Sequence, residues 1–350
     1  MHTQSLINLL RHPESSAQLA EGDWNAVVLA ARQNQLLGAL AAQLLGSPGW
    51  DAVPAPVKRH LHLELLTAER RSESALWELG VIRQTISADV DLVVLKGCAY
   101  VAAGDANHAG RIFSDLDVLV DRQHLQRVEM ELIGGGWKPG KVNAYDDAYY
   151  RNWMHEVPPM EHVRRHTVLD LHHAINPPVA DNPINSAMLL ARKVEISPGF
   201  FVLAPLDRVI HCAIHLIQEG EPKKLLRDLY DLHQLLAQHC VEKPDLQRLL
   251  TRSRELGVGH LVSAAVGAAG RLFSVPTGVM PSTALQRCLV IAAQNAHVSG
   301  SAAGWMAGTA VLIYSHWIKM PLRLLVPHLC RKSFQAVFAK GNDANKDRES

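Results

Sequence analysis

The sequence predicts an α+β fold, in which a strand-bearing central segment lies between two helical regions. Three apolar runs have the length and the Val- and Leu-rich composition of strands buried inside a sheet: Leu92–Leu95, Ile112–Val120 and Val168–His172. Outside this segment, apolar residues recur every three or four positions, which is the pattern of amphipathic helices. The two patterns together indicate a sheet-forming core with helices before and after it.

This change of pattern divides the chain into four expected parts. One helix is expected after Asp23 and a long second helix after Pro54-Ala55-Pro56, because Asp caps helix N-termini and Pro is tolerated in the first turn. The helical pattern returns at Leu206, and the polar end of the chain is expected to be disordered. The expected parts are a helical region at 1–90, an α/β core at 91–205, a helical region at 206–340 and a disordered tail at 341–350.

The composition excludes several classes of function. A hydrophobic content of 48% with 20% charged residues is that of a globular protein with a substantial core. The 35 basic and 34 acidic residues leave a net charge of only +1, so no nucleic-acid partner is expected. The five cysteines are scattered without a Cys-x-x-Cys pair, and residues 1–10 lack a secretory signal pattern. The expected location is therefore the cytoplasm.

Paired acids on one expected strand indicate a metal site. Asp115 and Asp117 are two positions apart, so their side chains share one face of the strand within 112–120. Their neighbours are apolar, and two adjacent carboxylates inside a sheet are unfavourable unless a cation lies between them. Without a metal, the same pattern describes a strand end whose acids cap a helix or face water.

Two further features accompany the acid pair. Lys96-Gly97 follows the first strand and precedes a helix; a glycine there lets backbone N–H groups approach an anion, and the lysine adds a charge suited to phosphate. Asp170 interrupts the apolar run Val168–His172 and is a third acid on a buried strand.

His211 and His215 lie one helical turn apart, but the glutamate of a zinc-hydrolase His-Glu-x-x-His motif is absent.

The segments near the third acid are expected to be extended. The aromatic and polar stretch 137–150 is expected to form a strand and an irregular lip. Two more strands are expected at 153–157 and 163–175, on either side of Pro158-Pro159.

The C-terminal part, 305–338, is apolar with basic residues at intervals. An uncharged run that leads into it, Ser299 to Ile318, is borderline for the about 20 apolar residues that a membrane span needs. We expect a packed terminal helix, and the alternative is an amphipathic element that lies on a membrane surface.

The features with chemical potential occur in the order and spacing of one known family. They are Leu95-Lys96-Gly97, Arg111, Ser114-Asp115-Leu116-Asp117-Val118-Leu119-Val120, Val168-Leu169-Asp170-Leu171-His172 and Leu226-Arg227-Asp228-Leu229-Tyr230-Asp231-Leu232. This combination resembles the uncharacterised nucleotidyltransferase family of the polymerase-β-like superfamily, and the likeness covers roughly residues 75–240.

The resemblance implies a small mixed β-sheet nucleotidyltransferase core flanked by helices. It implies transfer of a nucleoside monophosphate from an NTP to a hydroxyl of a small-molecule, peptide or protein acceptor. The catalytic residues, which would also hold Mg²⁺ or Mn²⁺, would be Asp115, Asp117 and Asp170. The residues implied to contact the nucleotide phosphates or the carboxylates are Lys96, Gly97, Arg111 and Ser114.

Several alternatives stay open. The turn reads Gly97-Cys98, where the superfamily has Gly-Ser or Gly-Gly, so the hydroxyl that touches the terminal phosphate is missing. One alternative is therefore a catalytically degenerate nucleotide-binding or partner-binding protein on the same fold. Another is a metal-dependent phosphohydrolase that uses Asp170, His172, His211 and His215. Arg111 is expected to pair with Asp115 or Asp117 if no metal binds there.

Overall fold

The computed structural model describes residues 2–140, 142–274, 282–298 and 300–331 of the chain. Within these residues the protein has one seven-stranded mixed sheet and helices on both sides of it in sequence, which confirms the α+β fold. The expected disordered tail at 341–350 and the end of the apolar C-terminal part, 332–338, lie outside the described residues. The division at residues 90, 205 and 340 stays a prediction.

The N-terminal region is helical, as expected, but its first long helix is broken. The helices before the sheet are α1 (His2–Arg11), α2 (Trp24–Gln33), α3 (Leu37–Leu45) and α4 (Ala55–Thr85), with short 3-10 turns at Pro13–Gln18, Glu21–Asp23 and Pro48–Ala52. The break between α2 and α3 occurs where Gln35 has a φ of +56°, a value that a continuous helix does not allow. Asp23 precedes α2 without making a side-chain cap.

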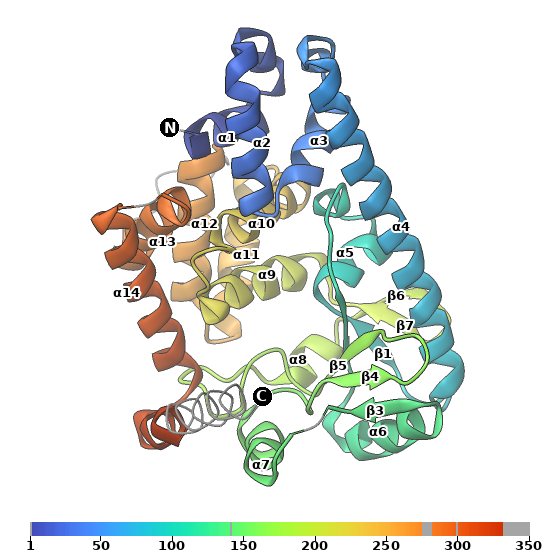
Figure 1. The fold of residues 1–350 in the computed structure, drawn as a ribbon. Coiled ribbons are helices and arrows are strands. Elements are labelled where there is room, and N and C mark those ends of the chain that lie inside the picture. The colour runs from blue at the N-terminus through green and yellow to red at the C-terminus, as the bar shows by residue number, and fades with distance from the viewer. Residues whose placement is uncertain (1, 141, 275–281, 299, 332–350) are drawn as a thin grey trace, which may run out of the picture.

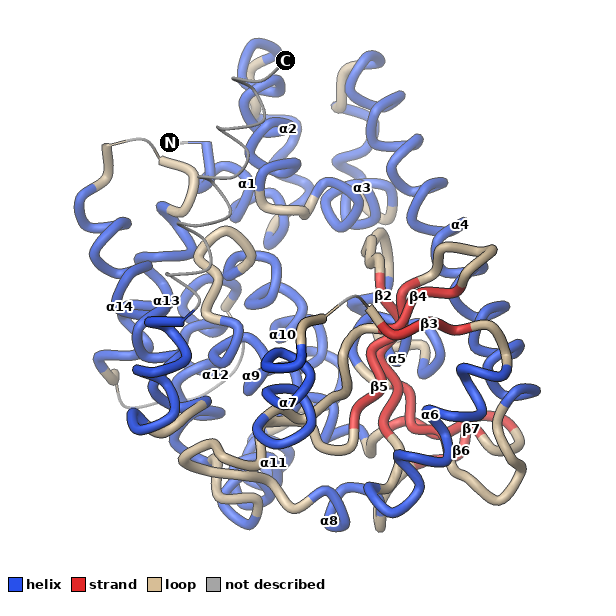
Figure 2. Tube along the Cα trace, turned by 60° about the horizontal axis from the view of Figure 1, so that its bottom comes forward, coloured by secondary structure: helices blue, strands red, loops and turns tan. Residues whose placement is uncertain are grey.

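The sheet has the strand order β3-β4-β5-β2-β1-β7-β6, so β2 lies near its centre. Its strands are β1 (Leu92–Val94), β2 (Asp115–Leu119), β3 (Trp137–Pro139), β4 (Met160–His162), β5 (Val168–His172), β6 (Val194–Ser197) and β7 (Phe200–Val202). The parallel pairs are β2 with β5 and β1 with β7. Figure 2 shows the strands gathered on one side of the molecule and the later helices on the other.

Four helices interrupt or follow the strands: α5 (Lys96–Ala103), α6 (Leu125–Gly134), α7 (Ala144–Trp153) and α8 (Ser186–Leu190). Between them lie 3-10 turns at Ala106–His108 and Arg122–His124. The strand expected within 137–150 is present as β3, but the expected irregular lip is wrong because it is mostly the helix α7. The strand expected at 153–157 is also wrong, since only Glu156 forms a β-bridge there. The strand expected at 163–175 is present as the shorter β5. Asn143 begins α7 by accepting hydrogen bonds from the backbone N–H groups of Tyr145 and Asp146, and this cap outweighs the strand preference of the aromatic residues.

The C-terminal region contains α9 (Pro205–Glu219), α10 (Leu225–His239), α11 (Lys243–Glu255), α12 (Gly259–Phe273), α13 (Ala284–Asn295) and α14 (Ala302–Lys319). Figure 1 shows α4 along one edge of the molecule, reaching from the N-terminal helices to the sheet, and α14 at the opposite edge. Residues 322–331 are again helical. In the described part of the chain, no helix is long and apolar enough to cross a membrane.

Two hydrophobic clusters stabilise this arrangement. The larger one joins helices from both ends of the chain and contains Leu40 and Leu61 together with Ile214, Leu229 and Leu261. The smaller one lies between α4, the sheet and α6, and its members include Ile82, Val94, Val118, Leu132 and Leu171. Helices from both ends of the sequence therefore form one continuous support for the sheet.

A buried ionic cluster fixes the loop that leads into β2. Asp105, which follows α5, is completely buried and accepts hydrogen bonds from Arg208 Nε (2.7 Å) and Nη2 (2.6 Å) of α9. It also contacts His239 Nε2 of α10 at 2.8 Å. A buried carboxylate with bidentate arginine contacts and a histidine contact is well compensated, so the loop start is tied to two helices.

Candidate active site

The three expected acids lie on adjacent strands and line one cavity. Because β2 and β5 are parallel, Asp117 is the direct register partner of Asp170, and Asp115 is two residues before Asp117 on β2. All three side chains line a cavity of about 600 Å³. Asp117 is buried, whereas Asp115 and Asp170 are half-buried. The sheet register therefore brings together acids that are more than fifty residues apart in sequence.

Lys96 points from the strand-to-helix turn at the acids. Its Nζ donates to Oδ1 of Asp117 at 2.6 Å. Burial alone lowers the pKa of Lys96, but the Asp117 carboxylate outweighs burial and raises it. Burial likewise favours a neutral Asp117, yet Lys96 and His172 hold the pKa of Asp117 well below its usual range. Asp117 is therefore a permanently charged carboxylate.

The Lys96-Gly97 turn is tightly constrained. Lys96 has a φ of +47°, a left-handed backbone conformation that costs about 1–3 kcal/mol for a residue with a side chain. A Cβ at Gly97 would lie 2.8 Å from Cγ of Phe113, so this position accepts only glycine without movement of the ring. Cys98, at the position of the missing hydroxyl, is buried, and burial raises the pKa of its thiol well above the usual value. A buried neutral thiol does not replace that hydroxyl as a phosphate contact.

Asp170 has a raised pKa, in contrast to its register partner Asp117. Burial, with the carboxylates of Asp117 and Glu156, raises the pKa of Asp170 to about 7. Its Oδ1 is buried and has no hydrogen-bond partner among the described residues. An unpartnered carboxylate oxygen beside other carboxylates is the donor set that a hard divalent cation prefers. The acids therefore fit Mg²⁺ or Mn²⁺.

Glu156 and His155 belong to the site although no pattern in the sequence indicates them. They follow α7 in a loop, where Glu156 forms a β-bridge opposite His172. His172 Nε2 lies 3.0 Å from Oδ1 of Asp117 and 3.4 Å from Oε2 of Glu156. The potential ligand atoms of His155, Glu156 and His172 lie within 4.8 Å of one another. His155 and Glu156 line the same cavity, whereas His172 is buried and contacts both Asp117 and Glu156. The donor set thus extends to residues that become neighbours of the acids only through the register of β5.

The remaining expected contacts are distributed differently. Arg111 pairs with Asp231 of α10 and lies over the ring of Tyr100 at 5.5 Å, so the expectation that it pairs with Asp115 or Asp117 is wrong. The reason is that the loop before β2 turns toward α10. Ser114 is exposed at the start of β2 and lines the cavity. Arg111 also lines it, so both remain within reach of a ligand there.

His211 and His215 lie one turn apart on α9, as their spacing predicts, with ring centroids 6.3 Å apart. Burial lowers the pKa of both, to about 3 for His211. They are neutral side chains in the wall behind Lys96 and Arg111. Neither belongs to the cluster of His155, Glu156 and His172, so the geometry does not favour the phosphohydrolase alternative.

Basic side chains also line this cavity, and they come from both helical regions and from the loop before β2. They are Arg32, Arg111, Lys224, Arg227 and Lys319. The wall from the N-terminal region is held in place by glycines, since a Cβ at Gly38 of α3 would lie 2.0 Å from the backbone oxygen of Gly110. The cavity thus has three carboxylates from the sheet strands and more basic than acidic side chains from the helices, where Glu64 and Glu219 are the acids. An excess of cations beside grouped carboxylates suits a metal-bound polyphosphate.

The fold and this site define a class of α+β proteins in which acids on adjacent central strands lie beside a lysine-glycine turn. A model of the family described as uncharacterised nucleotidyltransferase matches residues 20–274, and the chain belongs to this family. The family resemblance of the motifs is thereby confirmed. A comparison with curated proteins gave no match, and a comparison with solved structures gave none either.

Proposed function

We propose that the protein is a metal-dependent nucleotidyltransferase that moves a nucleoside monophosphate from an NTP to a hydroxyl of a small-molecule, peptide or protein acceptor. One observation carries the proposal: Asp117 and Asp170 are register partners on parallel strands and, with Asp115, line one cavity. Membership of the nucleotidyltransferase family supports the same chemistry. In this proposal Asp115, Asp117 and Asp170 hold Mg²⁺ or Mn²⁺, with the nearby Glu156 as an additional acid.

The metal contributes charge neutralisation on the triphosphate and a lowered pKa of the attacking hydroxyl. Residues of the chain supply the other contacts with the nucleotide. Lys96 and the backbone of Gly97 orient the phosphates from the turn, and the basic wall contributed by Lys224, Arg227 and Lys319 compensates their remaining charge. Arg111 and Ser114 contact the nucleotide from the loop before β2.

Asp170 is proposed to take the proton of the acceptor hydroxyl. Its pKa of about 7 is close to the value at which a general base is most effective at neutral pH. Asp117, which stays charged, is proposed as the fixed metal ligand. In this proposal both register partners hold the metal, and Asp170 in addition takes the proton of the acceptor hydroxyl.

A degenerate, nucleotide-binding protein on the same fold is a second candidate, and one observation favours it. Lys96 and His172 already contact Oδ1 of Asp117, so this carboxylate is compensated without a metal. Such a protein would bind an NTP through Lys96 and the basic wall but would not release pyrophosphate. A cytoplasmic location, in keeping with the five free cysteines, belongs to both versions of the proposal.

The deciding experiment incubates the purified protein with each labelled NTP, Mg²⁺ or Mn²⁺ and candidate acceptors, and follows pyrophosphate release and acceptor mass. The expected result is transfer that falls at least about a hundredfold in Asp115→Ala, Asp117→Asn and Asp170→Asn, since each change removes a carboxylate from the metal site. Asp147→Asn, on the exposed face of α7, is the matched control. Equal turnover in the wild type and the Asp117 variant contradicts the mechanism, and NTP binding without pyrophosphate release identifies the degenerate protein.

A further inference from the structure

The last long helix, α14, buries small residues and exposes large apolar ones, which is the reverse of an ordinary surface helix. Its buried face consists mostly of small residues: Gly304, Ala307, Gly308, Val311, Ser315 and Ile318. Its exposed face carries the large apolar residues Trp305, Met306, Leu312, Ile313 and Trp317, which we call the α14 face. Trp305 is 72% exposed and Ile313 62% exposed. A helix of a globular protein normally turns its largest apolar side chains toward the core.

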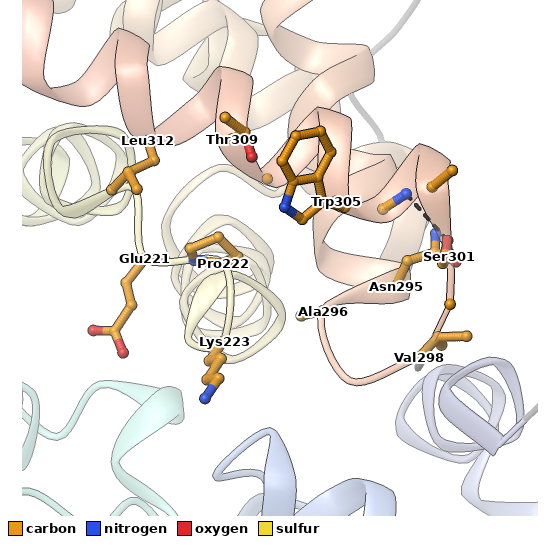
Figure 3. A pocket seen from close by; sticks show the side chains of 14 residues that line it. Glu221, Pro222, Lys223, Asn295, Ala296, Val298, Ser301, Trp305, Thr309 and Leu312 are labelled. Carbon is orange, nitrogen blue, oxygen red and sulfur yellow. Dashed lines mark hydrogen bonds between the residues drawn. The ribbon is translucent and has the colours of Figure 1, made fainter.

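Close packing of the small residues explains this orientation. A Cβ at Gly308 would lie 3.1 Å from Cγ of Pro222 in the turn between α9 and α10, and one at Gly220 would lie 2.5 Å from Cβ of Ser315. Figure 3 shows Trp305 and Leu312 beside Pro222, where they line an open pocket of about 730 Å³. The helix cannot rotate its tryptophans inward without breaking these contacts, so the apolar face is fixed outward.

The sequence segment that contains α14 has basic residues and no acids, although Glu219 and Glu221, at the end of α9 and just after it, lie beside the helix in space. The sequence contains no Asp or Glu between Glu255 and Asp343, a stretch that includes all of α12, α13 and α14. Within the described residues after Trp317, the basic side chains are Lys319, Arg323 and Arg331. Exposed apolar residues continue there as well, at Leu322, Val326 and Leu329. Apolar side chains, tryptophans and cations without acids form the composition of an interfacial membrane element.

We propose that the α14 face lies on the surface of an anionic lipid bilayer. Tryptophan is suited to this position because its ring enters the boundary between headgroups and acyl chains while its N–H remains near water. Among the basic residues that follow, Lys319 pairs with Glu219 and Arg331 lies over the ring of Tyr145. The exposed Arg323 is therefore the residue that attracts anionic headgroups. No helix in the described ranges is able to span a bilayer, which agrees with a helix that lies in the interface. The inference stands on α14 and the residues that follow it, and it does not depend on the proposed nucleotide chemistry.

The test is sedimentation of the full-length protein with vesicles of phosphatidylcholine alone or mixed with phosphatidylglycerol. We expect the protein to sediment with the mixed vesicles, and the double variant Trp305→Ser, Trp317→Ser to lose at least about tenfold in partition coefficient. The matched control is Trp77→Ser, because Trp77 is 60% exposed on α4, remote in sequence from α14. Arg323→Glu is expected to weaken binding to the anionic vesicles, with Arg70→Glu on α4 as its control.

Unchanged thermal unfolding shows that each variant is folded, which is expected because the substituted side chains are exposed. Blue-shifted tryptophan fluorescence on addition of anionic vesicles, absent in the double variant, supports the proposal. No sedimentation of the wild type with either vesicle, or equal loss in the Trp77 control, overturns it. A dimer by light scattering that dissociates in the double variant also overturns it, because the face would then bind a second copy of the chain.

Discussion

Asp117 of β2 and Asp170 of β5 are direct register partners, yet the pKa values of their carboxyl groups shift in opposite directions. Lys96 and His172 contact Asp117 and keep its pKa low, whereas burial, Asp117 and Glu156 raise the pKa of Asp170 to about 7. One position is thus always charged near neutral pH, and the other titrates there. This difference, rather than the presence of acids alone, makes the pair suited to ligand and base roles.

The contribution of Asp170 to the stability of the metal-free protein is expected to fall as the pH rises from 3.8 to about 7. The pKa of Asp170 is about 7 in the folded state and 3.8 in its unperturbed state, so between these values the folded state binds the extra proton, and above 7 it no longer does. Asp170→Asn removes the free-energy cost of ionising this carboxyl group in the folded state. At pH 8 the variant is expected to be more stable than the wild type by about 2 kcal/mol, after allowance for partial exposure. Denaturant unfolding at pH 5 and pH 8 measures the effect.

The same titration predicts how Mg²⁺ acts. Mg²⁺ must displace the proton from Asp170, so the rise in Tm that it causes in the wild type is expected to be larger at pH 8 than at pH 6. In Asp170→Asn the Mg²⁺ effect is expected to be small at both pH values. An equal Mg²⁺ effect at the two pH values in the wild type would contradict the role given to Asp170.

Lys96→Met is expected to make folding depend on a divalent cation. The change leaves the buried Asp117 carboxylate with His172 as its remaining contact among those described. Loss of one partner of a buried pair costs about 3–5 kcal/mol. Mg²⁺ is expected to restore part of this loss because it replaces the missing positive charge. Lys138→Met, at an exposed position of β3, is the control. Equal Tm values for the wild type and the Lys96 variant without metal would show that the ion pair contributes little.

Gly38→Ala is expected to destabilise the protein by at least about 2 kcal/mol, because the new Cβ meets a backbone oxygen that cannot rotate away. The atom is the carbonyl oxygen of Gly110, which lies 2.0 Å from the position that the added Cβ would occupy. Gly80→Ala in α4 meets no atom within 4 Å, so it is expected to stabilise the helix by up to about 1 kcal/mol. Chemical denaturation of the two variants gives opposite signs if the contact between α3 and the loop is as close as described.

Local pattern was sufficient for much of the fold. The apolar runs predicted β1, β2 and β5, and the periodic stripes predicted α4 and the helices from α9 onward. Both follow from side-chain periodicity, which is a property of neighbouring residues. The prediction from local pattern was wrong at α7, where the Asn143 cap outweighed the strand propensity of the aromatic residues. It was also wrong at the break between α2 and α3.

The sequence by itself determined which side chains have the chemistry of the site: three acids on expected strands, a lysine-glycine turn and a family-like order. Only the tertiary structure decided what each of them contacts. The parallel register of β2 and β5 set Asp117 beside Asp170, the β-bridge at Glu156 added an acid from a loop, and the path of the loop before β2 directed Arg111 to Asp231. These contacts join residues far apart in the chain, and the free energy that selects them comes from packing and charge compensation that no local spacing records.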